Sequence, residues 1–206
     1  MAEKKLQKIV IASNNKGKIA EIAEILAGYF EVVSMNDAGV DTEIEETGTT
    51  FEQNAVIKAR MCFEYTGLPS LADDSGLEVE ALGGEPGVYS AVYAKSAHSH
   101  YSQSASDQNI DLLLSNLQDI KNRRAKFVCV VAFYDGKTIL LGRGETCGEI
   151  LHERAGSDGF GYDPVFWSND LKQSFGKVSG EVKNKISHRR RALDDLLSKH
   201  GKHLSK

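Results

Sequence analysis

The chain has 206 residues, of which 41% are hydrophobic, and its formal net charge at pH 7 is -4. This length and composition fit one globular unit that can bury its own core. The negative charge argues against an extended phosphate-neutralising surface, because nucleic-acid binders usually gather Lys and Arg into a dominant patch. No stretch approaches the roughly 18 consecutive apolar residues of a membrane span, and the polar start is unlike a secretion signal. We therefore expect a cytoplasmic protein that binds neither nucleic acid nor membrane.

The first part of the chain alternates strand and helix patterns. Residues 8–13 form a short apolar run rich in β-branched residues, which predicts a strand. The Asn14-Asn15 pair offers helix caps before isoleucines at helical spacing, so a helix is predicted to follow and to end at Gly28. A second strand is predicted over residues 30–34.

A second helix is predicted after an acidic loop. The loop over residues 36–48 is rich in acidic and small residues. Thr49 and Thr50 each stand three residues before a Glu or Gln, which is capping-box spacing, so the helix is predicted to begin at one of them. Gly67, with Pro69 after it, is predicted to end the helix.

The middle of the chain carries two adjacent carboxylates. Residues 70–72 lead into Asp73-Asp74-Ser75-Gly76, and an extended pattern resumes over residues 77–82. We therefore expect the carboxylates to interrupt strand-like sequence. The stretch 94–106, rich in Ser, His and Tyr, is predicted to be an exposed loop, and residues 107–117 are predicted to form a short helix.

The remainder of the chain predicts strands followed by a basic helix. Residues 126–134 are apolar at successive positions, as in a strand buried on both faces, and Asp135-Gly136 is predicted to be a two-residue turn into a strand over 137–142. A further strand is predicted around residues 145–151. A basic helix is predicted from Ser187, as its cap, to about residue 199.

The order of these elements indicates the fold class. Helices interleaved with a mostly strand centre predict an α/β or α+β architecture, with one long mixed β-sheet and helices packed on it. No internal repeat or low-complexity linker divides the sequence. We therefore predict a single domain over residues 1–206.

The turn over residues 13–18 is the first candidate for chemistry. Its sequence is Ser13-Asn14-Asn15-Lys16-Gly17-Lys18. Because it follows a predicted strand and opens a predicted helix, its backbone N–H groups and the helix dipole favour an anion. It is not a P-loop, since the first glycine of that motif is absent and Ile19 stands where Ser or Thr should follow the lysine. The alternative is an ordinary capped helix with solvated lysines.

Two acidic pairs are the second candidate. Asp73 and Asp74 repel each other, so a nearby cation is the natural compensation, and Glu45 and Glu46 form another pair in a loop. Magnesium prefers few carboxylates together with waters and phosphate oxygens, which one Asp and one Glu from two loops would allow. The other carboxylate could then orient or deprotonate water. The alternative is a turn formed by the Asp pair and a hydrated Glu pair.

Aromatic and basic residues near the end of the chain are the third candidate. Residues 159–164 place aromatic rings between glycines, and such rings can stack on a purine while Asp163 accepts from ribose or base. Lys183 and Ser187-His188-Arg189 lie at the front of the last predicted helix, where their donors suit an anion or a carbonyl of a base. The alternatives are a small core cluster and a solvated basic helix face.

Taken together in this order, these segments resemble the inosine triphosphate pyrophosphatase family, the house-cleaning enzymes also called XTP/dITP diphosphatases. The resemblance covers nearly the whole chain. It is carried by the ordered blocks SNNKGK, EETGTTFEQNAVIKA, LADDSGLEVEALGGEPGVYSA, GFGYDPVF and ISHR.

The resemblance implies an elongated mixed α/β fold of two lobes with the nucleotide in a cleft, a homodimer and dependence on Mg²⁺. It implies that Glu45 and Asp74 hold the metal and that Asp74 is also the base that activates water, beside Asp73. The residues that would hold the triphosphate are Ser13, Asn14, Asn15, Lys16, Gly17, Lys18, Lys58 and Ser75. Those that would hold base and sugar are Phe160, Gly161, Tyr162, Asp163, Lys183, His188 and Arg189.

The implied activity is hydrolysis of a purine nucleoside triphosphate such as ITP, dITP or XTP to the monophosphate and pyrophosphate. Val92 stands where an Arg is common in the family, and the loop over residues 95–106 is longer than usual. Alternatives from the sequence are a house-cleaning pyrophosphatase for modified pyrimidine nucleotides, a nucleotide sensor without turnover and a basic-helix nucleic-acid binder. The paired acidic loops argue against the last two.

Overall fold

The computed structural model describes residues 6–42, 44–96 and 104–204. The chain divides into two compact units. Unit 1 comprises residues 1–74, 129–144 and 189–206, and unit 2 comprises residues 75–128 and 145–188. Each predicted site residue belongs to one of these two units, and each unit is described by itself.

The strands form a mixed sheet of seven strands in the order β2-β1-β3-β4-β5-β6-β7. Their bounds are β1 Gln7–Ile11, β2 Phe30–Ser34, β3 Ser70–Val79, β4 Arg124–Tyr134, β5 Ile139–Ile150, β6 Phe166–Ser168 and β7 Gln173–Ser174. β1 pairs in parallel with β2 and with β3, whereas the pairs β5–β6 and β6–β7 are antiparallel. The mixed α/β sheet predicted from the sequence is therefore confirmed.

The helices are of two kinds. The α-helices are α1 Lys16–Ile25, α2 Phe51–Thr66, α3 Ala105–Asn116, α4 Gly180–Asn184 and α5 His188–Leu204. Short 3-10 helices are η1 Glu80–Leu82, η2 Gly87–Ser96, η3 Asp163–Val165 and η4 Phe175–Lys177. Over the described ranges, no helix combines the length and the apolar character needed to cross a membrane.

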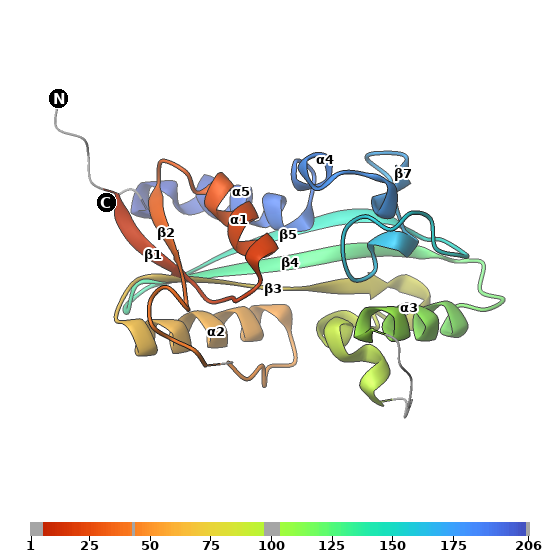
Figure 1. Ribbon diagram of the computed structural model, residues 1–206, viewed down its shortest axis with the longest axis horizontal. Helices are drawn as coiled ribbons and strands as arrows, with labels where there is room; N and C mark the ends of the chain where they lie inside the picture. The colour runs from red at the N-terminus through yellow and green to blue at the C-terminus, as the bar shows by residue number, and fades with distance from the viewer. Residues whose placement is uncertain (1–5, 43, 97–103, 205–206) are drawn as a thin grey trace. The chain divides into compact units, whose positions relative to one another are not determined.

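Unit 1 is a layered structure. Helices α1 and α5 lie on one face of its strands and α2 lies on the other (Figure 1). The core between α1, α5 and the strands is formed by Ile22 and Leu26 of α1, Leu193 of α5, and strand residues such as Ile9 and Val131. This burial of apolar residues fixes the start of α1 beside the end of β1, which is where the first candidate turn lies.

Unit 2 has its own core. Leu113 and Leu117 at the end of α3 pack with Phe127 of β4 and with Phe166 and Phe175. The rings of Phe127 and Phe166 lie 4.6 Å apart between centroids, and those of Phe166 and Phe175 lie 5.1 Å apart. This aromatic cluster anchors the segment 160–178, much of which has little regular secondary structure.

Three of the local signals for helix ends are confirmed, whereas α1 ends at Ile25, before the predicted Gly28. The side chain of Asn15 accepts a hydrogen bond from the backbone N–H of Lys18 and caps α1. The side chain of Thr50 accepts from the backbone N–H of Gln53 and caps α2. Gly67 ends α2 in the left-handed region, with a φ of 66°, a conformation that glycine adopts without the steric cost of a Cβ.

Several predictions of element boundaries were wrong. β3 runs through Asp73 and Asp74 without interruption, because the burial of these side chains is compensated by ion pairs, and residues 80–82 form a 3-10 turn rather than strand. The two strands predicted over 137–142 and 145–151 are one strand, β5. The connection between β4 and β5 has four residues, 135–138, rather than two.

The predicted loop over residues 94–106 was also partly wrong. Its described residues include a buried Ala94 within η2 and the first turn of α3, which begins at Ala105 rather than at residue 107. Residues 97–103 of this loop lie outside the described residues. The sequence analysis also missed α4, β6 and β7, which are too short to show a periodic pattern.

A buried arginine ties several elements of unit 2 together. The guanidinium of Arg123 donates to the backbone carbonyls of Ile150, Leu117 and Leu151, at 2.6, 3.0 and 2.7 Å. Leu117 is the C-cap of α3, whose last carbonyls need donors from outside the helix. Arg123 therefore joins the end of α3 to the end of β5.

We expect Arg123→Met to lower the free energy of unfolding by about 1–3 kcal/mol, because three backbone carbonyls lose the guanidinium as a donor. Urea unfolding followed by circular dichroism measures the change. The matched control is Arg124→Met, since Arg124 and its partner Glu80 are largely exposed and such pairs contribute at most about 1 kcal/mol. Equal midpoints for the two variants would contradict the structural role of Arg123.

Candidate functional site

The turn between β1 and α1 directs Lys18 toward a buried carboxylate. The backbone N–H of Asn15 donates to Oγ of Ser13, and Oδ1 of Asn15 accepts from the backbone N–H of Lys18, both at 3.1 Å. The side chain of Lys18 is only partly exposed, and its Nζ lies 3.1 Å from Oδ2 of Asp73. The sequence-predicted turn and the predicted acidic pair are thus in direct contact.

A cavity of about 520 Å³ in unit 1 opens beside this contact. It collects side chains from the first turn of α1, from the acidic loop, from α2 and from β3. Its lining includes the predicted residues Ser13, Asn14, Lys18, Lys58 and Asp73, together with Ala12, Met35, Asp41, Thr42, Ile44 and Glu46. Asn15, Lys16 and Gly17 of the predicted anion turn are exposed at the surface and are not part of this lining.

Two cations bond to Oδ2 of Asp73. In addition to Lys18, the guanidinium of Arg189 lies 3.1 Å from Oδ2 of Asp73, and its other end lies 2.7 Å from Oε2 of Glu21. Burial alone would raise the pKa of Asp73, but the charges of Lys18, Arg189 and Lys58 hold this pKa well below its usual range. These cations therefore favour the ionised form of Asp73.

Arg189 was predicted to contact base and sugar. In the structure only 2% of its side chain is exposed, and its guanidinium bonds to Asp73 and Glu21. In this structure Arg189 therefore joins Asp73 to Glu21.

Asp74 has a different environment from its neighbour. Nζ of Lys58 lies 3.0 Å from Oδ1 of Asp74, and Nδ2 of Asn54 donates to Oδ2 at 3.2 Å. Burial raises the pKa of Asp74 and the charge of Glu46 adds to the rise, against the opposing effect of Lys58 and Asn54. A carboxylate with a raised pKa is a better proton acceptor than one with an ordinary pKa, so Asp74 suits general-base chemistry.

Substitutions of the two charged neighbours should move the pKa of Asp74 in opposite directions. We expect Glu46→Gln to lower it, because a negative charge is removed, and Lys58→Met to raise it, because the compensating ammonium is lost. A pH titration followed by ¹³C NMR of the Asp74 carboxyl measures both shifts. Asp135, whose pKa is lowered by backbone N–H donors in its own turn, is an internal control that should stay constant. Shifts of the same sign in both variants would contradict the assignment.

The acidic loop and β3 offer donors that fit a divalent cation. Nζ of Lys58 lies 2.7 Å from Oε1 of Glu46 and 3.0 Å from Oδ1 of Asp74, so carboxylates from two elements already converge on one positive charge. Within the described part of the chain, no group of three or more His, Cys, Asp or Glu side chains could hold a metal. A pair of carboxylates suits Mg²⁺, which keeps several waters and takes phosphate oxygens from a substrate. Glu45, the residue predicted as ligand, is exposed, and Glu46 is the one bonded to Lys58.

In unit 2 a second polar cluster surrounds Asp163. Its Oδ2 lies 2.5 Å from Nζ of Lys183 and accepts from the backbone N–H of Phe160 at 2.8 Å. The Lys183 ammonium lies 4.4 Å from the centre of the Phe160 ring, which is 57% exposed. Oδ1 of Asp163 is buried and has no hydrogen-bond partner among the described residues. The cluster therefore combines an exposed ring with an unpaired acceptor.

The other predicted residues of unit 2 are less accessible. Tyr162 is buried in the core, and its hydroxyl donates to the backbone carbonyl of Ser90 at 2.9 Å. The ring of His188 is also buried and stacks on Phe127, with 5.0 Å between centroids. Gly161 and Ser75 are partly exposed. Phe160 is thus the ring of the predicted loop that can meet a ligand.

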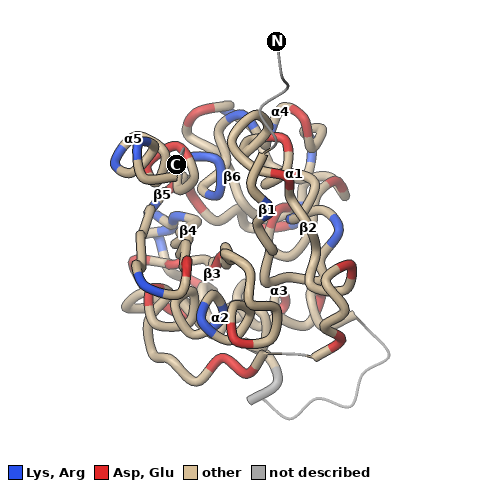
Figure 2. The backbone as a smooth tube through the Cα atoms, turned by 90° about the vertical axis from the view of Figure 1, so that its left-hand side faces the viewer, with Lys and Arg blue, Asp and Glu red and all other residues tan. Residues whose placement is uncertain are grey.

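Two of the basic residues of α5 pair with acidic residues on the same helix, which carries charges of both signs (Figure 2). Arg190 pairs with Asp194 at 3.0 Å and Lys199 pairs with Asp195 at 2.7 Å. These pairs favour the interpretation of this face as a solvated helix surface and not as a phosphate-binding surface.

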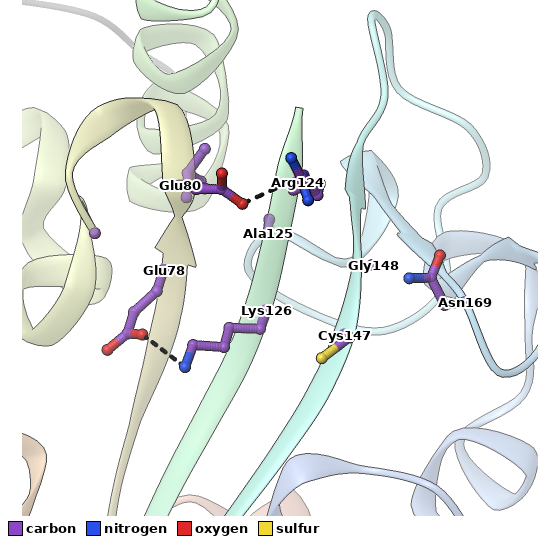
Figure 3. Close-up of a pocket in the computed structure, with 10 residues that line it drawn as sticks. Glu78, Glu80, Arg124, Ala125, Lys126, Cys147, Gly148 and Asn169 are labelled. Carbon is purple, nitrogen blue, oxygen red and sulfur yellow. Dashed lines mark ion pairs between the residues drawn. The ribbon is translucent and has the colours of Figure 1, made fainter. Parts of the chain in front are cut away.

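Another groove, of about 320 Å³, lies on unit 2 between the ends of β3, β4 and β5 (Figure 3). Its charges pair with one another, since Lys126 lies 3.4 Å from Glu78 and Arg124 lies 3.3 Å from Glu80. None of its lining residues is one that the sequence analysis singled out. The groove offers no unpaired charge to a ligand.

Sequence reasoning missed Asn54 and Glu21. Asn54 stands one helical turn before Lys58, so the spacing of four residues on a predicted helix could have placed both on one face. Glu21 stands three residues after Lys18 and contacts Arg189, 168 positions later in the chain. That separation leaves no local signal for the pair.

Comparison with known proteins gives a consistent result. The sequence profile of the Ham1 family matches residues 9–199. The chain is 43% identical over 199 residues to a dITP/XTP pyrophosphatase of Photorhabdus laumondii, covering 93% of this chain and 97% of that relative. It is similar in structure to the Ham1 protein of Staphylococcus aureus, with a TM-score of 0.84 and 39% identity over 96% of this chain and 100% of the other. A HAM1 protein from Coxiella burnetii superposes with a TM-score of 0.85 at 37% identity, over 96% of this chain and 100% of the other.

Proposed function

Because the chain belongs to the Ham1 family, as the resemblance of its sequence predicted, we propose that it hydrolyses ITP, dITP and XTP to the nucleoside monophosphate and pyrophosphate. The names of its relatives support this substrate class. The observation that carries the proposal is the pair of buried carboxylates, Asp73 and Asp74, which bond to Lys18 and Lys58 beside a cavity that both lysines and Asp73 line. Such an enzyme removes damaged purines from the nucleotide pool, which supports a cytoplasmic location.

The cavity of unit 1 is the proposed site of the triphosphate. Lys18 and Lys58 would supply compact positive charges, and Ser13 and Asn14 in the lining would add polar groups. The backbone of residues 13–18 at the start of α1 would favour the negative charge further. Ser75, which follows Asp74, belongs to the same proposal.

The same site is proposed to hold Mg²⁺ through Asp74 and a glutamate of the acidic loop, Glu45 in the sequence prediction. When bound, the ion would neutralise the phosphate charge that repels an attacking hydroxide and would stabilise pyrophosphate as it leaves. The convergence of Glu46 and Asp74 on one ammonium supports a cation in this position, and it favours Glu46 as the glutamate involved.

Asp74 is the proposed base. It would take a proton from a water molecule, and the resulting hydroxide would attack the α-phosphorus in line with the leaving pyrophosphate. The bond from the α-phosphorus to the oxygen that bridges to the β-phosphorus breaks, and its electrons leave with pyrophosphate. Asp73, whose pKa is held low by Lys18 and Arg189, would remain ionised and keep Lys18 in place.

The residues of unit 2 are proposed to select the base. Phe160 would stack on the purine, and the unpaired Oδ1 of Asp163 would accept from the base or the ribose. Lys183 and His188 would contribute donors to the 6-oxo group of hypoxanthine or xanthine. Adenine carries an amine at this position, so donor would face donor and ATP would be a poor substrate.

The decisive experiment compares ITP, XTP, GTP and ATP with magnesium and identifies the inorganic product. We expect ITP and XTP to be hydrolysed fastest, with release of pyrophosphate and none in the presence of a chelator. Release of orthophosphate would exclude attack at the α-phosphorus. Equal rates on ITP and ATP would reject the selectivity, and binding without turnover would favour the sensor.

A homodimer is also part of the proposal, on the resemblance to the family alone. Size-exclusion chromatography with light scattering should give twice the mass of the chain, 22.5 kDa. A mass that stays at one chain across the working concentrations would remove the dimer from the proposal.

A further inference from the structure

We propose that Asn54 is a positioning residue that fixes the carboxylate of Asp74 by tying it to the acidic loop. The inference rests on the proposed function, in which Asp74 is the base. Asn54 lies on α2, one turn after the Thr50 cap, and only 2% of the residue is exposed. The oxygen and the nitrogen of its side-chain amide each make a hydrogen bond.

The orientation of the Asn54 amide follows from its neighbours. The backbone N–H of Gly48 donates at 2.7 Å, so the atom that receives this bond is the carbonyl oxygen, Oδ1. The opposite atom is then Nδ2, which donates to Oδ2 of Asp74 at 3.2 Å. A backbone donor cannot be reversed, so Asn54 is a fixed donor toward Asp74.

Two donors hold the Asp74 carboxylate, one at each oxygen. Lys58 bonds to Oδ1 and Asn54 bonds to Oδ2. Rotation of the carboxylate about its bond to Cβ would break both bonds together. Because each oxygen has about two acceptor positions, one position at each oxygen remains for a water molecule or a cation. The arrangement therefore orients the base without saturating it.

Lys58 alone would orient the Asp74 carboxylate poorly. Its side chain is long and flexible, and its ammonium is shared with Glu46 at 2.7 Å. Asn54 is short, buried and held at its far end by the main chain. As a neutral donor, it also orients Asp74 without adding a positive charge that would weaken the base.

The acidic loop approaches Asn54 closely. A Cβ added at Gly48 would lie 2.6 Å from Oδ1 of Asn54 and 2.7 Å from Cβ of Gln53. No side chain fits in this space without a shift of the loop or of the amide. Because Gly48 has no side chain, its backbone can approach the Asn54 amide closely. The loop that carries Glu45 and Glu46 therefore contacts the same amide that bonds to Asp74.

The test uses Asn54→Leu and the smaller Asn54→Ser in the full-length protein. We expect kcat for ITP to fall roughly 10- to 100-fold in both folded variants while KM changes less than about twofold, as for loss of an interaction that acts on the chemical step. The control is Thr66→Val, which removes a hydroxyl that bonds to the carbonyl of Cys62 at the other end of α2. It should lower stability slightly and leave kcat unchanged.

A double-variant cycle separates positioning from a general effect on the fold. In an Asp74→Asn background, Asn54→Leu should lower the residual rate less than about twofold, because the group that Asn54 orients is already gone. Multiplication of the two effects, or an unchanged kcat in the folded single variants, would overturn the inference.

A second readout does not depend on turnover. In the unaltered protein the side-chain amide protons of Asn54 should exchange slowly with solvent, as measured by NMR, and Asp74→Ala should speed this exchange. Slow exchange without hydrolysis of ITP would reject the proposed function but keep the Asn54–Asp74 link. Exchange at the same rate in both proteins would reject the link even if ITP is hydrolysed.

Discussion

Asp74→Asn is expected to lower kcat for ITP by roughly 10²- to 10⁴-fold, the usual contribution of a general base, and to leave the fold intact. An amide has the shape of the carboxylate but cannot take a proton from water. It also keeps one oxygen that can accept from Lys58 or Asn54, whereas its NH2 group faces the other donor, so one of the two contacts is kept. Pyrophosphate release measured with saturating ITP and magnesium gives the rate.

The matched control is Asp119→Asn. Asp119 is exposed and has a φ of 62°, a left-handed conformation that Asn tolerates as well as Asp. Its replacement should change neither rate nor stability. A near-normal rate for Asp74→Asn, with the control unchanged, would remove Asp74 from the mechanism.

Arg189→Met is expected to cause the largest loss of stability of any single substitution considered, about 3–5 kcal/mol. Met fills much of the space of the arginine stem, but it leaves the buried carboxylates of Glu21 and Asp73 without their shared guanidinium. Lys18 remains and compensates Asp73 in part. The midpoint of urea unfolding measures the loss.

Two further variants identify the cause of this loss. Arg190→Met, at the next position, removes a half-exposed pair with Asp194, and the loss of such a pair should cost at most about 1 kcal/mol. Adding Glu21→Gln to Arg189→Met should restore part of the stability, since one uncompensated charge disappears. No recovery in the double variant would indicate that packing, and not charge, is what Arg189 contributes.

The sequence predicted those features that depend on neighbouring residues. The caps at Asn15 and Thr50 and the glycine end of α2 at Gly67 were recognised because a capping residue acts within three positions of itself. The strand over residues 30–34 was predicted from a brief local run, and β2 has the same bounds.

Contacts between distant positions escaped the sequence. The continuity of β3 through Asp73 and Asp74 depends on Lys18 and Arg189, which are 55 and 116 positions away from Asp73. Two adjacent acidic residues predict a break in a strand when the sequence is considered locally. The ion pairs of Asp73 with Lys18 and Arg189 allow the strand to continue while its carboxylates are buried. The family resemblance identified the acidic corner, and the structure supplied the partners that explain it.

Helix α2 sets the positions of both side chains that donate to the Asp74 carboxylate. Asn54 and Lys58 stand four residues apart on it, a rise of about 6 Å along one rigid rod, and both reach Asp74. A tilt of α2 displaces the Asn54 amide and the Lys58 ammonium together. A movement of the helix backbone therefore changes both contacts to Asp74 at once. Substitutions that tilt α2 should therefore disturb both contacts to the Asp74 carboxylate together.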